Sequence, residues 1–367
     1  MRILICPDKF KGSLTATEAA AALRRGVLRA LPEAEVRLQP LADGGEGSLE
    51  MYRSFDPELQ TRRLTVTGPL RRPVQAEYLL GGGRAVIESA AACGLQLVPP
   101  PRRHPKHTTT IGVGMLIDDA LARGARDITL LLGGSSTNDC GAGMAAALGY
   151  RFLSVGGDDF VPMADSLRWV AEIDGRQRIA ALEEARITAV CDVSNPLLGP
   201  NGATYTYAEQ KGAHPAELPL LEENMLHFAL CVRQQLGVAL TELPGGGAAG
   251  GTAAGAVAFL DARLATGTEV LFELVGLAQE IARADLVLTG EGKVDRQTLS
   301  GKVVAGVIGH GRPTVVLCGR TEVTATELGC EAVVPLLRAG RSARDCMHRA
   351  AALLEAEIYG YLVGRQV

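Results

Sequence analysis

The sequence is poor in aromatic residues and has no excess of basic charge, and both features exclude classes of function. Phe, Trp and Tyr make up 4% of the 367 residues, whereas glycine occurs 44 times. Such a chain offers few aromatic platforms on which nucleic acid bases could stack. Its formal net charge of -4 provides no basic field to neutralise a phosphate backbone. We therefore expect no nucleic acid partner.

Long apolar runs and paired cysteines are absent as well. No stretch reaches the roughly 20 apolar residues that a membrane-spanning helix needs, and no signal-peptide pattern precedes the strand-like residues 2–6. The eight cysteines are scattered singly and form no CxxC pair, which favours buried reduced thiols over disulfides or a zinc site. We expect a cytoplasmic protein with no membrane partner.

Several catalytic signatures are missing from the chain. It has no GxxxxGK[ST] loop, no HRD or DFG sequence, no HExxH and no GxSxG. These absences argue against Walker A enzymes, protein kinases, HExxH metalloproteases and serine hydrolases. His104 and His107 lie in a basic turn, and we interpret them as surface residues.

A short apolar run, a glycine-rich turn and a helical stretch recur along the chain. Strand-like runs occur at residues 2–6, 35–41, 127–132, 186–193, 285–289 and 313–318. Their alternation with helical stretches predicts a parallel α/β sheet. Thr15 and Glu18 form a capping box that predicts a helix start, and residues 344–363 are predicted to form the last helix. Residues 64–88 alternate around three glycines and predict an antiparallel hairpin, whereas residues 156–184 have no clear pattern.

Two polar loops near the N-terminus could carry chemistry. Residues 7–13 (PDKFKGS) place Asp8, Lys9 and Lys11 before a helix start, which favours an anion site. A solvated basic turn is the alternative for this loop. Residues 43–47 (DGGEG) bring the carboxylates of Asp43 and Glu46 together, as metal binding or proton abstraction requires. An acidic turn at a helix start is the alternative there.

Two later loops combine glycine with hydrogen-bonding side chains. Residues 133–139 (GGSSTND) offer hydroxyls, an amide and backbone donors, which favours a phosphate or carboxylate cradle over simple N-capping. Residues 289–295 (TGEGKVD) present Glu291, Lys293 and Asp295 at two-residue spacing and continue to Lys302. This pattern is suited to a metal-bound phosphate, and a surface ion-pair cluster is the alternative.

Two other segments complete the candidates. Asp192 follows a strand-like run and is a candidate for metal binding or for accepting a hydroxyl proton. Residues 245–250 match GxGxxG, the dinucleotide-binding pattern, although the run before them contains Pro244 and makes no clean strand. Close contact of these glycines with a nucleotide or with another helix fits equally well.

Together these segments resemble the bacterial glycerate kinase family that includes the glycerate 2-kinases. The resemblance runs nearly end to end and is specific because eight segments occur in the same order. They are residues 7–14, 41–47, 108–114, 133–143, 191–202, 210–212, 244–251 and 289–302. The chain departs from the family where Ser136 replaces the usual Ala and Cys140 the common Gly, and neither change removes an ionisable group.

The resemblance implies two α/β domains, one of them Rossmann- or flavodoxin-like, in a discontinuous chain with an interdomain active-site cleft. We expect residues 1–75 and 285–367 to form one domain and residues 76–284 to be inserted in it. The implied function is ATP-dependent phosphorylation of glycerate in glycerate, glucarate or glyoxylate catabolism, with 2-phosphoglycerate the favoured product. Mg²⁺ is the implied cofactor, ATP and glycerate are the partners, and a homodimer stays open.

The resemblance also suggests roles for individual residues. The residues expected in catalysis are Asp192, Asp43, Lys11 and Asp8, with Asp192 the first choice as base. Those expected to bind the nucleotide are Gly133, Gly134, Ser135, Ser136, Asn138, Gly290, Glu291, Lys293 and Lys302. Those expected to hold the metal are Asp192, Glu291 and Asp295.

Two rival functions stay open at this point. A nicotinamide-dependent oxidoreductase of a small hydroxy acid would use the glycines of residues 245–250. A ligand-sensing regulator with a kinase-like fold would need no catalytic base, but the sequence has neither a DNA-binding module nor a basic stripe.

Overall fold

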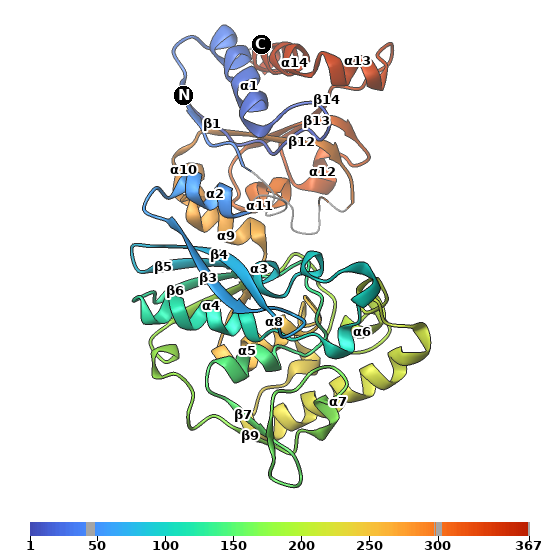
Figure 1. The fold of residues 1–367 in the computed structure, drawn as a ribbon. Helices are drawn as coiled ribbons and strands as arrows, with labels where there is room; N and C mark the ends of the chain where they lie inside the picture. Colours follow the sequence, from blue (N-terminus) through green and yellow to red (C-terminus); the bar gives the residue numbers. More distant parts are fainter. Residues whose placement is uncertain (42–47, 297, 299–302, 366–367) are drawn as a thin grey trace. The chain divides into compact units, whose positions relative to one another are not determined.

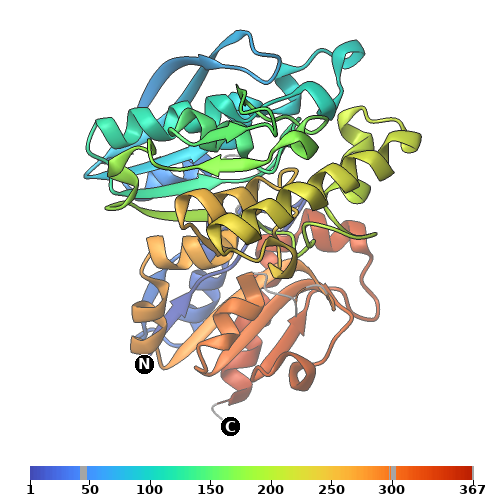
Figure 2. The same ribbon diagram turned by 90° about the horizontal axis from the view of Figure 1, so that it is seen from below.

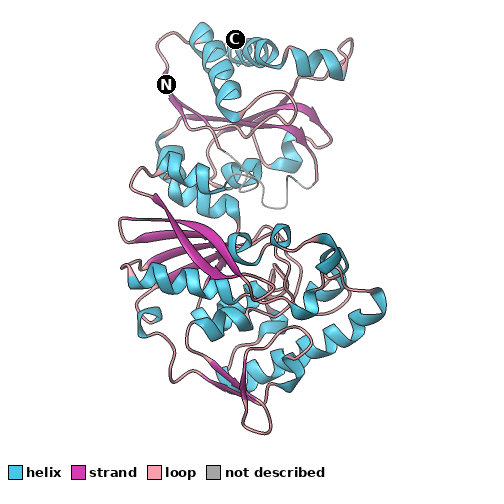
Figure 3. Ribbon diagram, in the orientation of Figure 1, coloured by secondary structure: helices cyan, strands magenta, loops and turns pink. Residues whose placement is uncertain are grey.

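The chain forms two compact α/β units. The structure is a computed structural model, and it describes residues 1–41, 48–296, 298 and 303–365. Unit 1 comprises Met1–Glu46 and Thr266–Val367, and unit 2 comprises Gly47–Ala265. Both units combine strands with helices (Figure 3), so the predicted α/β class is confirmed.

A five-stranded parallel sheet forms the centre of unit 1. Its strands are β1 (Arg2–Ile5), β2 (Glu35–Leu38), β12 (Leu286–Val294), β13 (Thr314–Thr321) and β14 (Ala332–Pro335). They are ordered β14-β13-β12-β1-β2, which reads 2-1-3-4-5 when the strands of the unit are counted along the chain. The order reverses between β1 and β12. Ligands of open α/β sheets bind beyond the carboxyl ends of the strands at such a switch point.

Alternate side chains of this sheet point to opposite faces and belong to different hydrophobic cores. Ile3, Leu288 and Leu317 belong to a core shared with α1 (Ala16–Ala30) and α14 (Ala350–Arg365), which lie together on one side of the sheet in Figure 1. Val316 and Cys318 belong to a second core, with α11 (Val303–Gly309) and α12 (Ala325–Leu328). The remaining helices of the unit are α9 (Gly267–Leu274), α10 (Leu277–Arg283) and α13 (Ala343–His348).

Two helix predictions in unit 1 have different outcomes. The capping box at the start of α1 is confirmed, because the Thr15 side chain accepts from Glu18 N–H while the Glu18 carboxylate accepts from Thr15 N–H. The single helix predicted for residues 344–363 is wrong, because α13 ends at His348 and α14 begins at Ala350.

Unit 2 is built on a six-stranded mixed sheet with the order β11-β10-β6-β5-β4-β3. The strands are β3 (Gln60–Thr67), β4 (Pro73–Gly81), β5 (Arg84–Glu88), β6 (Asp127–Leu131), β10 (Arg186–Val190) and β11 (Arg263–Ala265). The strands from β5 to β11 are parallel, and β4 is antiparallel to both its neighbours, which confirms the predicted hairpin. The loops after β5, β6 and β10 therefore leave from one edge.

Helices pack against this sheet around one large core. They are α2 (Ser48–Phe55), α3 (Ser89–Cys93), α4 (Ile111–Ala122), α5 (Ala142–Ala147), α6 (Ala203–Tyr207), α7 (Leu218–Leu236) and α8 (Thr252–Leu260). Figure 2 shows α7, coloured yellow, as a long helix of this unit. Phe152, Phe228 and Phe259 meet in the core, with ring centroids 5.8 Å apart for Phe152 and each of the other two.

Residues 156–184, which have no clear sequence pattern, supply two strands of a small separate sheet. Strands β7 (Arg151–Leu153), β8 (Asp159–Phe160) and β9 (Glu172–Asp174) pair antiparallel in the order β8-β7-β9, and Figure 1 labels β7 and β9. These strands are two or three residues long, which is too short for a period-two hydrophobic pattern to stand out.

The division into units differs from the predicted domain boundaries. A boundary after residue 75 would fall inside β4, which pairs with β3 along its length and so belongs with it. At the other end the units divide before α9 rather than at residue 285, because α10 contacts β1 and α9 contacts α11.

Two further features bear on the setting of the protein. All eight cysteines lie in the described part of the chain and are free thiols, six of them buried. Among the described residues, no helix has both the length and the apolar character needed to cross a membrane.

Candidate active site

A cavity of about 600 Å³ opens at the carboxyl edge of the sheet in unit 1. It is lined by the segments after β1 and β14 and by the carboxyl-terminal residues of β12 and β13, and so includes the point where the strand order reverses. Its charged lining residues are Asp8, Lys9, Lys11, Glu291, Lys293, Asp295 and Arg320. An apolar wall is supplied by Phe10, Leu336, Leu337 and Met347. The first and fourth predicted loops thus come together at one site.

Glycines allow the N-terminal loop to lie against β12. A Cβ on Gly292 would be 3.2 Å from the Lys11 backbone nitrogen, so any larger residue would push the lysine loop away. Gly290 is buried within β12, where its carbonyl accepts from Asp8 N–H at 2.8 Å and a Cβ would lie 1.9 Å from the carbonyl oxygen of Leu317. Packing therefore accounts for Gly290, and its contact with a nucleotide stays a prediction.

The charged side chains of this cavity are already paired in part. Lys293 Nζ lies 2.8 Å from Asp295 Oδ2 and 2.9 Å from Glu322 Oε1. The hydrogen bonds that Lys293 donates to Asp295 and Glu322 raise its pKa, which keeps it cationic. The ion-pair alternative therefore describes the contacts of Lys293, of whose two partners Asp295 lines the cavity. The motif is also not a loop as predicted, because β12 continues through Val294 alongside β13.

The carboxylates of this cavity fit a hard cation that also binds phosphate. Asp8, Glu291 and Asp295 all line the cavity, and Glu291 Oε1 accepts a hydrogen bond from Thr298 Oγ1 at 2.8 Å. Among the described residues, no group of three or more His, Cys, Asp or Glu side chains is placed to hold a metal ion alone. Mg²⁺ commonly uses one or two carboxylates together with phosphate and water oxygens, so this donor set fits it.

The loop after β6 in unit 2 is held by buried hydroxyl groups. Ser136 Oγ donates to the carbonyl of Cys93 at 2.9 Å, and Thr108 Oγ1 donates to the carbonyl of Ser136 at 2.8 Å. Asn138 is fully buried and its amide donates to Thr204 Oγ1 at 3.2 Å. Gly133 and Gly134, by contrast, are exposed. Ser136 and Asn138 therefore brace the loop, and the exposed glycines are its accessible part.

Two ionisable groups to which the sequence analysis gave no role hold this loop in place: Asp139 at its end and Lys211 from a distant segment. The Asp139 carboxylate accepts from both the N–H and the hydroxyl of Thr110, at 2.9 and 2.8 Å, and burial raises its pKa. The Lys211 ammonium donates to Ser135 Oγ at 3.1 Å and to the carbonyl of Thr137 at 2.7 Å. Residues 210–212 were part of the family resemblance, but no pattern in the sequence indicated what Lys211 contacts.

The glycine run at residues 244–251 serves backbone packing. A Cβ on Gly247 would lie 2.3 Å from the carbonyl oxygen of Pro196, and one on Gly250 would lie 2.0 Å from that of Thr137. The run therefore packs between the loops that follow β6 and β10. The closest contacts observed are with loop backbone rather than with another helix, and contact of the run with a nucleotide stays a prediction. Packing thus accounts for these glycines without a dinucleotide site.

Asp192 lies just beyond β10, at the same edge of the unit 2 sheet as the loop after β6. Its residue is exposed, and the segment that follows turns back sharply, with Asn195 Nδ2 donating to the carbonyl of Asn201 at 2.7 Å. Asp192 belongs to unit 2 whereas Glu291 and Asp295 belong to unit 1. A metal shared by these three residues stays a prediction.

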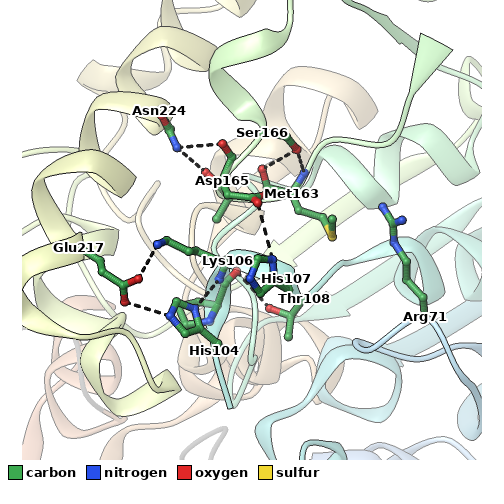
Figure 4. Close-up of polar contacts among 12 residues, drawn as sticks. Arg71, His104, Lys106, His107, Thr108, Met163, Asp165, Ser166, Glu217 and Asn224 are labelled. Atoms are coloured by element: carbon green, nitrogen blue, oxygen red, sulfur yellow. Dashed lines mark hydrogen bonds and ion pairs between the residues drawn. The ribbon is translucent and has the colours of Figure 1, made fainter. Parts of the chain in front are cut away.

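The two histidines of the basic turn have structural contacts (Figure 4). His104 Nε2 lies 2.9 Å from Glu217 Oε2, and Lys106 Nζ pairs with the other oxygen of the same carboxylate. The hydrogen bond from Lys106 lowers the pKa of Glu217 to about 2. His107 is largely exposed and lies 3.6 Å from Asp165. This cluster ties the turn to the start of α7, so His104 is a half-buried structural residue rather than a surface one.

Two predicted site residues fall outside the described part of the chain. They are Asp43, expected in catalysis, and Lys302, expected to bind the nucleotide. Their roles stay predictions.

Comparison with known proteins identifies relatives along the whole chain. Residues 3–361 match the model of the glycerate kinase family. A glycerate kinase from Halalkalibacterium halodurans is 41% identical over 364 residues, which cover 96% of this chain and 95% of that protein. A glycerate 2-kinase from Escherichia coli K12 is 40% identical over 325 residues, covering 87% and 85%. A crystal structure from Salmonella typhimurium LT2, of a protein assigned as glycerate kinase 2, has a TM-score of 0.80 at 37% identity and covers all of both chains.

Proposed function

Because the chain belongs to the glycerate kinase family, it is a kinase, and we propose that it transfers the γ-phosphoryl group of ATP to a hydroxyl group of glycerate. The family match over residues 3–361 carries this proposal. The cavity at the strand-order reversal of unit 1 supports it, since lysines and carboxylates meet there as phosphoryl transfer requires.

Unit 1 is the proposed nucleotide domain. Its strand order is that of flavodoxin-like sheets, in which ligands bind at the same switch point. Lys11 and Lys293, which both line the cavity, would neutralise phosphate oxygens, and Glu291 and Asp295 would hold Mg²⁺ with those oxygens. When bound, Mg²⁺ supplies charge neutralisation on the phosphates and fixes their orientation.

Unit 2 is the proposed glycerate domain. The loop of residues 133–138 has the exposed Gly133 and Gly134 beside the buried Ser135, and their N–H and hydroxyl donors suit a carboxylate. Asp192 is the proposed base that orients the substrate hydroxyl and accepts its proton, with Asp43 and Asp8 as the next choices. Phosphoryl transfer asks the protein chiefly for positioning and for stabilisation of charge. The interdomain location of the reaction stays a prediction.

The product is proposed to be 2-phosphoglycerate. The purified protein should release ADP only when ATP, glycerate and Mg²⁺ are all present, and phosphorus NMR of the product separates the 2- from the 3-phosphate. ADP release that does not depend on glycerate, or no release at all, would contradict the proposed reaction. A product phosphorylated at the 3-position would contradict only the regiochemistry.

A further inference from the structure

Lys211 is a buried lysine that the proposed reaction does not yet use. Its residue is 4% exposed, and both hydrogen bonds of its ammonium group end on the loop after β6, at Ser135 and Thr137. The backbone around it is held in place by Gly212, where φ is +99° and a Cβ would lie 2.1 Å from the carbonyl oxygen of Arg103. The backbone of Lys211 is thus held by packing at Gly212, and its side chain binds the loop after β6.

The hydrogen bond from Lys211 determines whether the Ser135 hydroxyl acts as an acceptor or as a donor toward other groups. An ammonium group has donors and no acceptor, whereas a hydroxyl has one donor and two lone pairs. Ser135 Oγ therefore accepts from Lys211, and its own proton is left for another acceptor. Among the described residues, no acceptor is found for that proton or for the N–H groups of Gly133 and Gly134.

Lys211 is mostly protonated at pH 7 even though burial lowers its pKa. The ionisable groups that face it are Cys93 and Asp139. Burial raises the pKa of Cys93 to about 12, so this thiol is neutral, and Asp139 is held by Thr110. Burial lowers the pKa of Lys211 to about 8, which leaves the ammonium form dominant at pH 7 and removes it above pH 8.

We propose that Lys211 is a positioning residue for anion binding, which orients the Ser135 hydroxyl so that it donates to an oxygen of a carboxylate or a phosphate. A hydrogen bond from a hydroxyl that itself accepts from an ammonium is strengthened by polarisation. The two sources of such an oxygen are the glycerate carboxylate and the phosphates of ATP. This inference rests on the proposed function and adds the group that would hold its anionic substrate.

The test measures binding without turnover, by calorimetry and by thermal stabilisation with glycerate alone and with inorganic phosphate alone. Lys211→Met should weaken the binding of one of these anions about ten- to a hundredfold, as expected for a charge-assisted hydrogen bond. Ser135→Ala should weaken the binding of the same anion. The double variant should lose no more affinity than the weaker-binding of the two single variants. Weaker binding of glycerate would identify the glycerate carboxylate as the group that Ser135 binds. Weaker binding of inorganic phosphate would identify a phosphate of the nucleotide instead.

A matched lysine and a pH series separate positioning from general structure. Lys106→Met removes another lysine that ties two segments together, and it should lower the melting temperature while leaving anion affinity unchanged. Wild-type affinity should fall as the pH rises through the lowered pKa of Lys211, which is about 8, toward the affinity of Lys211→Met. Lys211→Arg keeps its charge at that pH and should abolish the fall.

Three outcomes would overturn the proposal. They are normal anion affinity in a folded Lys211→Met variant, wild-type affinity that does not change across pH 8, and no binding of either anion by the wild-type protein. If Lys211→Met does not fold, the pH series and Ser135→Ala still decide. Absence of glycerate-dependent ADP release would refute the kinase proposal alone, because the binding measurements need no turnover.

Discussion

Replacing Gly250 by alanine tests whether the glycine run is a packing device or a nucleotide cradle. A Cβ at this position would lie 2.0 Å from the carbonyl oxygen of Thr137, which is backbone and cannot rotate away. The φ of Gly250 is +69°, in a region that disfavours L-residues by roughly 1–2 kcal/mol. Forcing a methyl group into packed structure adds about 1–3 kcal/mol. We expect unit 2 to lose about 2–5 kcal/mol in total.

Gly237→Ala is the matched control for this substitution. Gly237 has a φ of +74° at the end of α7, and a Cβ there would have no atom within 4 Å. Gly237→Ala should therefore introduce the strain of a positive φ without a steric clash. The difference of about 1–3 kcal/mol should place the melting temperature of Gly250→Ala about 2–12 °C below that of Gly237→Ala, for a unit of this size.

Thermal unfolding followed by circular dichroism measures this difference. Equal melting temperatures for the two variants would refute the packing argument. A Gly250→Ala variant that melts like the control but no longer binds ATP or NADH would show instead that the run contacts a nucleotide.

Asp192→Asn should lower kcat by about 10² or more, because it removes the proposed base; steady-state kinetics near wild type would exclude that role. Thr110→Val should lower the free energy of unfolding in urea by about 2–5 kcal/mol, since the buried Asp139 carboxylate loses a donor and the N–H of Met144 loses its acceptor. Thr110→Ser should recover most of this loss. Glu217 has a pKa lowered to about 2 from 4.5, chiefly by the hydrogen bond from Lys106, so its contribution is complete above pH 4.5 and is lost as the pH falls toward 2. Glu217→Gln should therefore remove this part of the acid destabilisation, and superimposable stability profiles of the two proteins between pH 4.5 and 2 would contradict the assignment.

Local patterns predicted much of the framework. The capping box of Thr15 and Glu18 starts α1 because both groups lie within one turn, so no distant residue is needed. The hairpin predicted within residues 64–88 follows from alternation around the glycine turn at residues 81–83. The first and fourth candidate loops do meet at one cavity, because the carboxyl ends of parallel strands share an edge of the sheet.

Predictions failed where a partner from another part of the chain decides the outcome. Residues 290–294 are strand rather than loop because β13 supplies hydrogen-bonding partners as far as Thr321. Residues 344–363 are two helices, and their apolar pattern does not reveal the break. Tight packing explains Gly290 and Gly250, yet a glycine in a sequence does not show whether backbone or a ligand approaches it.

By itself, the sequence determined the alternation of strands and helices and the places where glycine and charge follow a strand, since both depend on neighbours along the chain. Only the tertiary structure decided the pairings across the chain. Lys211 and Ser135 are 76 residues apart, and the carboxylate of Asp139 depends on a threonine 29 residues away. The physical reason is burial, because a charged or polar group taken out of water must find its partners wherever the folded chain places them.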